Sequence, residues 1–113
     1  MTDCIFCKIA SGEVAAKELY RDDEIVAIAD LNPQAPTHVL VIPRAHHEDL
    51  AALYDSGGGA LAQRLLATAT KLGREHGANG FRLVVNTGEE GGQTVAHVHV
   101  HVLAGRHMTW PPG

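Results

Sequence analysis

The sequence predicts an α+β fold in which an antiparallel sheet packs against one long helix. Short segments rich in β-branched residues alternate with turns, a pattern typical of β-strands. One stretch, residues 59–77, instead carries apolar residues at helical spacing. Hairpin-like connections between neighbouring strand candidates favour antiparallel pairing. Because 113 residues give room for one modest core, we expect a single domain over residues 1–113.

The first half of the chain contains two strand candidates on either side of a turn. Both are rich in β-branched residues, and the second is stopped by Pro43. Between them, Pro33 and Pro36 exclude regular pairing. The elements expected here are a helical turn at 3–13 that ends near Gly12, a strand at 24–30, a turn at 31–36, a strand at 37–43, and one or two helical turns at 47–57.

The second half contains the long helix and two further strand candidates. Gly77 is a natural C-terminal stop for this helix. Its apolar positions at helical spacing are Leu61, Leu65, Leu66, Ala69 and Leu72. The elements expected here are the helix at 59–77, a strand at 81–86, a glycine-rich loop at 87–94, a strand at 95–104 and an irregular tail at 105–113.

Composition and charge exclude several classes of partner. The formal net charge is -4 with histidine neutral, which disfavours a broad nucleic-acid surface. No apolar run approaches the roughly 20 residues of a membrane span, and the N-terminus has no signal-type apolar segment. We therefore expect a cytoplasmic protein with neither nucleic-acid nor membrane partners. An anionic ligand would have to be held by local hydrogen-bond donors.

Three of the eight histidines form an alternating row within residues 95–104. They are His97, His99 and His101, interleaved with Val98, Val100 and Val102. Successive side chains of a strand point to opposite faces, so we expect the histidines to share one face and the valines to pack on the helix. A merely solvated face would be served equally well by Thr, Lys or Glu. Two functional hypotheses remain: a His-x-His metal pair, or a catalytic array in which imidazoles attack and exchange protons.

The loop before this row favours the catalytic hypothesis. Gly88, Gly91 and Gly92 let backbone N–H groups converge on an anion, and Thr94 adds a hydroxyl. Alone, the same loop is equally well explained as a flexible hairpin. It is not a P-loop, because no Gly-Lys-Ser/Thr follows. Next to three histidines, it predicts a phosphate cradle beside a nucleophile.

These residues resemble the histidine triad (HIT) superfamily. Residues 97–105, HVHVHVLAG, look like its His-φ-His-φ-His-φ-φ signature, where φ is apolar. Residues 4–46 resemble the N-terminal half of the family. Residues 84–113, down to the Trp-Pro-Pro-Gly end, resemble its Hint (histidine triad nucleotide-binding) branch. The resemblance implies a HIT-like sheet of about five strands, a short N-terminal helix, and a two-fold homodimer with a continuous sheet.

The resemblance also implies an activity and a set of site residues. The activity is hydrolysis of purine nucleoside phosphoramidates through a covalent nucleotidyl-histidine intermediate, with nucleoside monophosphates as ligands. By position, His99 is the nucleophile, His101 contacts the phosphate oxygens, and His38 assists the leaving group. The other implied contacts are Asp30 for the ribose, Asn86, Gly92 and Thr94 for phosphate and leaving group, and Ile5, Phe6, Ile9, Ile28 and Leu40 for the base.

The physical requirements of such a reaction agree with these roles. His99 must attack as a neutral imidazole, so its other ring nitrogen needs an acceptor that fixes the tautomer, and we expect a backbone carbonyl. Backbone N–H groups, Thr94 and His101 would stabilise the phosphate oxygens as charge shifts in the transition state. Thr94 stands where the nearest relatives usually have Ser, but it retains the hydroxyl. No metal is needed for this step.

Two cysteines three residues apart add a metal hypothesis. The spacing Cys4-x-x-Cys7, without a secretory signal, indicates metal or redox chemistry more than a structural disulfide. The family resemblance implies one zinc held by Cys4, Cys7, His46 and His97, with His47 as the neighbour that could replace His46. Four protein ligands make a structural site, so we expect the zinc to matter for stability more than for chemistry. His76 and His107 have no special spacing and are expected at the surface.

Other functions and one assembly question stay open. The alternatives are a nucleotide-sensing binding module with vestigial turnover, a diadenosine polyphosphate hydrolase, and a zinc hydrolase with metal at His97 and His99. The Trp-Pro-Pro-Gly ending argues against the second, and the lack of an acidic ligand after the histidine pair argues against the third.

Trp110, the only Trp, would expose a large apolar surface in a lone chain. We therefore expect a homodimer whose tail reaches toward the partner's active site.

Overall fold

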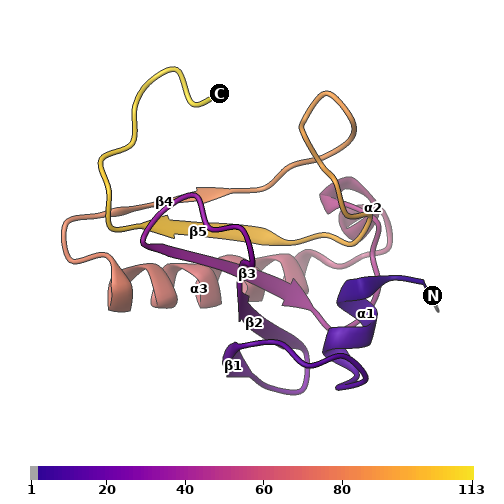
Figure 1. Ribbon diagram of the computed structural model, residues 1–113. Coiled ribbons are helices and arrows are strands. Elements are labelled where there is room, and N and C mark those ends of the chain that lie inside the picture. The colour runs from indigo at the N-terminus through magenta and orange to yellow at the C-terminus, as the bar shows by residue number, and fades with distance from the viewer. Residues whose placement is uncertain (1–2) are drawn as a thin grey trace.

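The computed structural model describes residues 3–113 as an antiparallel five-stranded sheet with helices against it (Figure 1). The strand order is β1-β2-β3-β5-β4, and every neighbouring pair is antiparallel. This confirms the predicted α+β class and sheet. The elements are α1 Ile5–Ala10, β1 Glu18–Arg21, β2 Ile25–Ala29, β3 Thr37–Pro43, α2 Leu50–Asp55, α3 Gly59–His76, β4 Phe81–Val84 and β5 Val100–Ala104.

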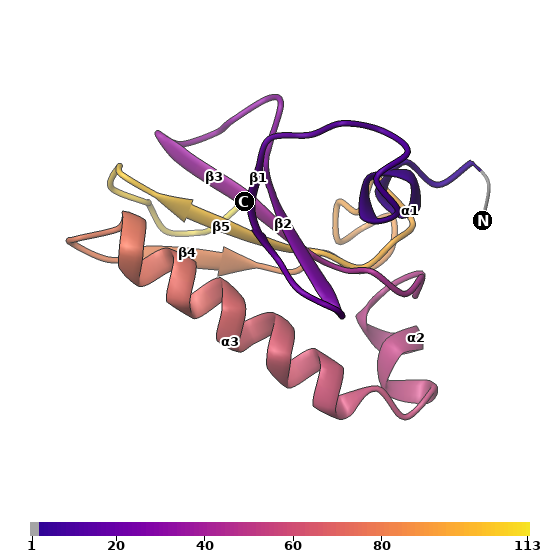
Figure 2. The same ribbon diagram turned by 90° about the horizontal axis from the view of Figure 1, so that it is seen from below.

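The two faces of the sheet carry separate hydrophobic clusters, because side chains alternate along each strand. In β2, Ile25 and Ala27 pack toward α3, whereas Val26 and Ile28 pack toward α1. Val98, Val100 and Val102 belong to the α3 cluster, as predicted. Figure 2 shows α3 running alongside β4 and β5, with α2 beside the start of α3 and α1 on the other side of the strands. The face away from α3 is therefore left for His38 and the histidine row.

The short helix α1 begins at a cysteine. The Cys4 side chain accepts a hydrogen bond from the backbone N–H of Cys7 at 3.4 Å, which caps the helix. Phe6, Ile9 and Ala10 bury one face of α1 against the sheet. The capping arrangement therefore brings both cysteines to the same end of α1, at the sheet face that carries the histidine row.

The strand bounds differ from the sequence expectation: β2 and β4 are each two residues shorter than expected, and the last and first strands differ most. The last strand was expected over 95–104, but β5 begins at Val100, and residues 95–97 form a bend. The His97 N–H bonds the Val95 carbonyl at 2.9 Å, which turns the chain before the strand starts. β1, residues 18–21, was not located from the sequence, because ELYR is short and only partly apolar. It lies at the edge of the sheet, where only one strand pairs with it.

The tail 105–113 follows β5 without helix or strand, as expected. Arg82 of β4 donates a hydrogen bond to the Thr109 carbonyl at 3.1 Å, which attaches the tail to the sheet edge. Trp110 is 82% exposed in the single chain. Within residues 3–113 we find no helix with the length and apolarity needed to cross a membrane.

Candidate active site and metal centre

His99, the middle residue of the row, is buried and fixed in one tautomer. Its Nδ1 lies 2.8 Å from the backbone carbonyl of His97. A carbonyl can only accept, so Nδ1 carries the proton and Nε2 carries the free lone pair. The ring packs edge-on against Phe6 with centroids 5.1 Å apart. The expected carbonyl acceptor is thus found, and the geometry leaves Nε2 as a nucleophile.

His101 is fixed in the opposite tautomer through His38. The backbone N–H of Gln34 donates to Nδ1 of His38 at 3.0 Å, so a neutral His38 carries its proton on Nε2. This Nε2 lies 2.9 Å from Nδ1 of His101, which must then accept. A neutral His101 therefore carries its proton on Nε2. The row thus presents a lone pair from His99 and an N–H donor from His101, on rings 5.0 Å apart.

Burial keeps this hydrogen-bonded chain neutral. Desolvation lowers the pKa of His101 to about 4, and the neighbouring His99 and His38 push it in the same direction. Desolvation also lowers the pKa of His38, although the nearby Asp30 carboxylate opposes this shift. Asp30 Oδ2 lies 3.5 Å from Nε2 of His38. Neutral imidazoles at neutral pH are the forms that the two assigned tautomers require.

An apolar cavity of about 370 Å³ opens beside these rings. Asp30 and Thr94 line it together with His99 and His101. All five residues expected to contact a base line it as well: Ile5, Phe6, Ile9, Ile28 and Leu40. Phe6, Ile9, Ile28 and Leu40 also belong to the hydrophobic core on this face, so they serve both packing and the cavity wall.

The glycine-rich loop borders the cavity at Thr94 only. Gly92, with a φ of +82°, is exposed, and Asn86 is half-buried just after β4. Neither of these two residues lines the cavity. The Gln93 side chain closes the loop: it accepts from the Gly88 N–H at 3.0 Å and donates to the carbonyls of Glu48 and Val95 at 2.7 and 3.0 Å.

Cys4, Cys7, His46 and His97 converge into one cluster whose donor atoms all lie within 4.8 Å of one another. The His97 Nδ1 lies 3.3 and 3.5 Å from the two Sγ atoms and 3.2 Å from Nδ1 of His46. Ligand atoms around a tetrahedral zinc are separated by roughly 3.3–3.8 Å, from Zn–N and Zn–S lengths. Two thiols and two imidazoles are also the donor types that zinc prefers. The residues fit a zinc ion, with His46 rather than His47 in the set.

The second ring nitrogen of His97 supports the same conclusion. Nε2 lies 2.8 Å from the Pro43 carbonyl, so it carries the proton and leaves the Nδ1 lone pair for a metal. Burial lowers the pKa of His97 to about 4, which favours this neutral form. His99 is not part of the cluster, so the alternative metal pair of His97 and His99 is not what the geometry shows.

A second group of potential metal ligands is better explained without a metal. Donor atoms of Asp30, His38 and His101 also lie within 4.8 Å of one another. The Gln34 N–H, however, occupies the Nδ1 lone pair of His38 and places its proton on the nitrogen that faces His101. This nitrogen would have to lose its proton before it could bind a metal. The group is therefore a chain of hydrogen bonds.

Several contributors were not identified from the sequence. Leu31 is fully exposed beside Asp30 and lines the cavity, and an apolar residue in a proline-containing turn could have indicated it. Lys17 and Val95 line the cavity too, without any local pattern that marks them. The backbone groups of Gln34 and Pro43 have no sequence signal, because their positions follow from the fold. His76 and His107 are exposed, as expected.

Comparison with known proteins gives consistent matches over nearly the whole chain. The HIT domain model matches residues 11–108. The chain is 41% identical to the 14 kDa zinc-binding protein of Brassica juncea, over 98% of this chain and 100% of that protein. It is also 41% identical to adenylylsulfatase HINT1 of Arabidopsis thaliana, over 96% of this chain and 76% of that protein. The crystal structure of a HIT family hydrolase from Legionella pneumophila superposes with a TM-score of 0.92 at 45% identity, covering 98% of this chain and 100% of that one.

Proposed function

This chain belongs to the HIT domain family and is a hydrolase, and from this premise we propose that it cleaves purine nucleoside phosphoramidates through a nucleotidyl group on His99. The observation that carries the proposal is the pair of opposite tautomers on His99 and His101. One ring offers a lone pair and the next offers an N–H, at the end of a cavity lined by apolar residues and Asp30. Attack on phosphorus needs both groups.

The steps follow from these positions. The base enters the slot of Ile5, Phe6, Ile9, Ile28 and Leu40, and Asp30 accepts from the ribose hydroxyls. The Nε2 lone pair of His99 attacks the α-phosphorus, a P–N bond forms, and the P–N bond to the amine breaks. The His101 N–H and the Thr94 hydroxyl stabilise the phosphate oxygens. The amine takes up a proton from solvent as it leaves, and His38 assists by keeping the His101 proton toward the phosphate. Water then attacks phosphorus, which releases the nucleoside monophosphate and frees His99.

The cradle formed by the glycine-rich loop belongs to the same proposal. Asn86 and Gly92 lie outside the cavity lining, so their contacts would be with phosphate oxygens or the leaving group at its rim. Gly92 has a φ of +82°, a backbone conformation that glycine adopts easily. Its neighbour Thr94 reaches the cavity from the same loop. Backbone N–H groups on this rim would face the side on which the amine departs.

A second candidate differs in the leaving group. The Arabidopsis thaliana relative is named an adenylylsulfatase, so adenylyl sulfate is a candidate substrate for the same nucleophile. In that reaction His99 would attack the same phosphorus and sulfate would leave with the bridging oxygen. Sulfate needs no proton to depart, whereas an amine does. Because His38 and His101 are neutral, the amine would take its proton from solvent, and kinetics decide between the two substrates.

Direct comparison of substrates tests the proposal. Steady-state kinetics on adenosine 5'-phosphoramidate, adenylyl sulfate and diadenosine polyphosphates, each with and without chelator, should rank the phosphoramidate first. Mass spectrometry of protein denatured at alkaline pH, where the P–N bond to histidine survives, should find an AMP adduct on the peptide that contains His99. Turnover of the diadenosine compound above the others, or no turnover of any nucleotide despite AMP binding, would favour one of the alternatives: a diadenosine polyphosphate hydrolase or a binding module.

We also propose one structural zinc per chain at Cys4, Cys7, His46 and His97. The zinc would link α1 to the segment after β3 and to the bend before β5, and it would supply cross-linking rather than chemistry. The zinc-binding relative in Brassica juncea supports this choice of metal. Two cysteines kept as thiols suit a reducing compartment, which is the basis for proposing a cytoplasmic location.

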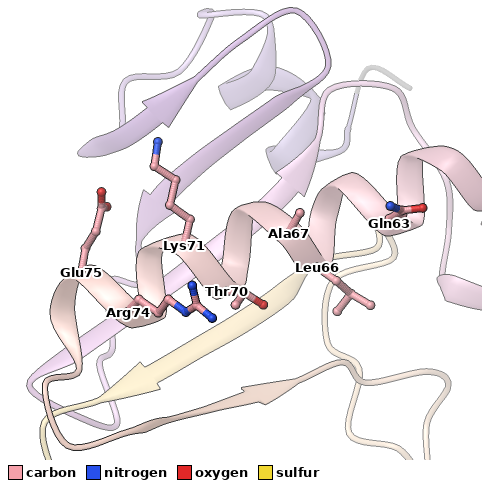
Figure 3. Close-up of a pocket in the computed structure, with 7 residues that line it drawn as sticks. All are labelled: Gln63, Leu66, Ala67, Thr70, Lys71, Arg74 and Glu75. Atoms are coloured by element: carbon pink, nitrogen blue, oxygen red, sulfur yellow. The ribbon is translucent and has the colours of Figure 1, made fainter.

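A homodimer completes the proposal. β4 is the last strand of the described sheet, so its outer edge offers unpaired backbone groups to a second strand. Figure 3 shows the neighbouring face of α3, where Leu66, Ala67 and Thr70 lie along a shallow hollow. Leu66 is 46% exposed there, although it lies at the helical spacing of core residues. Two chains joined at β4 by a two-fold axis would cover this face.

A further inference from the structure

The turn after β5 holds the loop between β2 and β3. Gly105 has a φ of +97°, and a Cβ at this position would lie only 2.8 Å from the Cβ of Pro36. Next to it, Nε of Arg106 donates to the backbone carbonyl of Gln34 at 2.8 Å. Two adjacent residues at the end of the histidine strand thus contact the 30–36 loop, one by close packing and one by a hydrogen bond.

The same loop determines the direction of the His38–His101 hydrogen bond. Its own bonds run from the Asn32 N–H to Asp30 Oδ1 at 2.8 Å and from Gln34 Nε2 to the Asn32 carbonyl at 3.0 Å. They shape the loop so that the Gln34 N–H faces Nδ1 of His38. Two neutral imidazoles that share one proton can be oriented either way. The N–H at the far end of His38 selects one orientation.

We propose that Arg106 is a positioning residue for His101, acting through Gln34 and His38. By holding the Gln34 residue in place, Arg106 keeps a donor on Nδ1 of His38, so that His38 donates to His101 and the proton of His101 stays on Nε2, toward the cavity. Without this donor, His38 can reverse and accept from Nδ1 of His101. His101 would then face the substrate with a lone pair, as His99 does, and could not stabilise phosphate oxygens.

The alternative is that Arg106 only holds the tail. Its Nη1 also donates to the His107 carbonyl at 3.3 Å, so a purely structural role is the competing explanation. Arg82 provides a matched comparison, because it donates to the tail carbonyl of Thr109 without contacting the 30–36 loop through that bond. If loosening of the tail is what matters, replacing either Arg106 or Arg82 should have the same effect. A change in the tautomer of His101 should appear only when Arg106 is replaced.

The test combines spectroscopy with kinetics on the full chain. Long-range ¹H–¹⁵N spectra of ¹⁵N-histidine-labelled protein report which nitrogen of each ring is protonated. In the parent, His38 and His101 should be protonated on Nε2, and His99 on Nδ1. In Arg106→Met, His101 should shift toward the other tautomer or exchange between the two. With adenosine 5'-phosphoramidate, kcat should fall about three- to tenfold, the effect of one lost hydrogen bond, with a smaller change in KM.

Controls separate this inference from the proposed function on which it rests. Arg106→Lys retains a donor and should restore most of the parent spectrum, and Arg82→Met should leave the His101 tautomer unchanged. A folded Arg106→Met variant whose His101 keeps the parent tautomer overturns the inference, whatever its turnover. A shifted tautomer with kcat unchanged also overturns it. If the parent hydrolyses no nucleotide, the proposed function fails, while the spectra still decide whether Arg106 sets the tautomer.

Discussion

The backbone carbonyl of His97 accepts the Nδ1–H of His99 at 2.8 Å, while the ring of the same His97 lies in the cluster of Cys4, Cys7 and His46. One residue therefore takes part in both the candidate metal centre and the candidate catalytic row. The His97 ring is fully buried, and its Nε2 is bound by the Pro43 carbonyl. The acceptor that fixes the tautomer of His99 is thus a backbone atom of a residue whose own ring is held by the cluster and by the Pro43 carbonyl.

Replacing the proposed nucleophile should abolish turnover and spare the fold. In His99→Ala, the apolar slot formed by α1, β2 and β3, which we propose binds the base of AMP, remains, so AMP binding should persist. Hydrolysis should fall by several orders of magnitude, because no covalent intermediate can form. Single-turnover kinetics and AMP titration measure the two effects, with His107→Ala as the surface control. Near-normal hydrolysis by His99→Ala would contradict the mechanism.

Removing one metal ligand should cost stability more than activity. Cys4→Ser should lose the metal and lower the melting temperature by at least about 5 °C, since a structural zinc contributes folding energy. The His97 ring should stay in place because Pro43 still holds it, so most turnover should remain. Elemental analysis, thermal melting and kinetics measure these effects. Absence of metal from the freshly purified parent protein would contradict the proposed zinc site. Loss of all turnover on gentle chelation, with the fold intact, would favour a zinc hydrolase.

Most of the fold follows from patterns that are local in the sequence, whereas the candidate zinc ligands Cys4, Cys7, His46 and His97 were expected from the family resemblance. Alternation placed Val98, Val100 and Val102 on the helix, and helical spacing located α3. The strand at 95–104 was predicted too long, because alternation continues through the bend at 95–97. A pattern of side chains does not reveal where the backbone stops pairing.

The two tautomers, in contrast, could not be predicted. They depend on the backbone carbonyl of His97 and the backbone N–H of Gln34. Every residue type has the carbonyl, and every type except proline has the N–H, so the side chains at these positions give no signal. Only the tertiary arrangement decides which of these groups meets an imidazole. The sequence could state that His99 needs a carbonyl, but not which carbonyl, and it contained no indication that Arg106 reaches Gln34.

The half-buried His101 should make stability depend on pH. An unfolded histidine titrates near 6.5, whereas burial lowers the pKa of His101 in the folded state to about 4. Between these values the unfolded chain binds a proton that the folded chain does not, so the free energy of unfolding falls as the pH falls from 6.5 to 4. In urea titrations, His101→Asn should reduce this slope, while the exposed His107→Asn retains it. Equal slopes in both variants would show that His101 is not the group involved. The cluster of Cys4, Cys7, His46 and His97 is unchanged in both variants, so its contribution to the slope cancels in the comparison.

The exposed tail should select the leaving group across a dimer. Trp110 is 82% exposed in the single chain, and the Arg82 bond to Thr109 attaches its segment to β4, at the edge proposed for dimerisation. A partner chain joined at β4 would cover the tail and bring it near a second active site. Deleting residues 108–113 should therefore change the ranking of phosphoramidates with small and bulky amines by several-fold, with less effect on AMP affinity, because the base slot is formed by other elements. Sedimentation at micromolar concentration measures the assembly, and kinetics on an amine series measures the ranking. If the protein is a monomer, the proposed contact of the tail with a partner chain is wrong. If it is a dimer and the ranking is unchanged by the deletion, Trp110 does not select the leaving group.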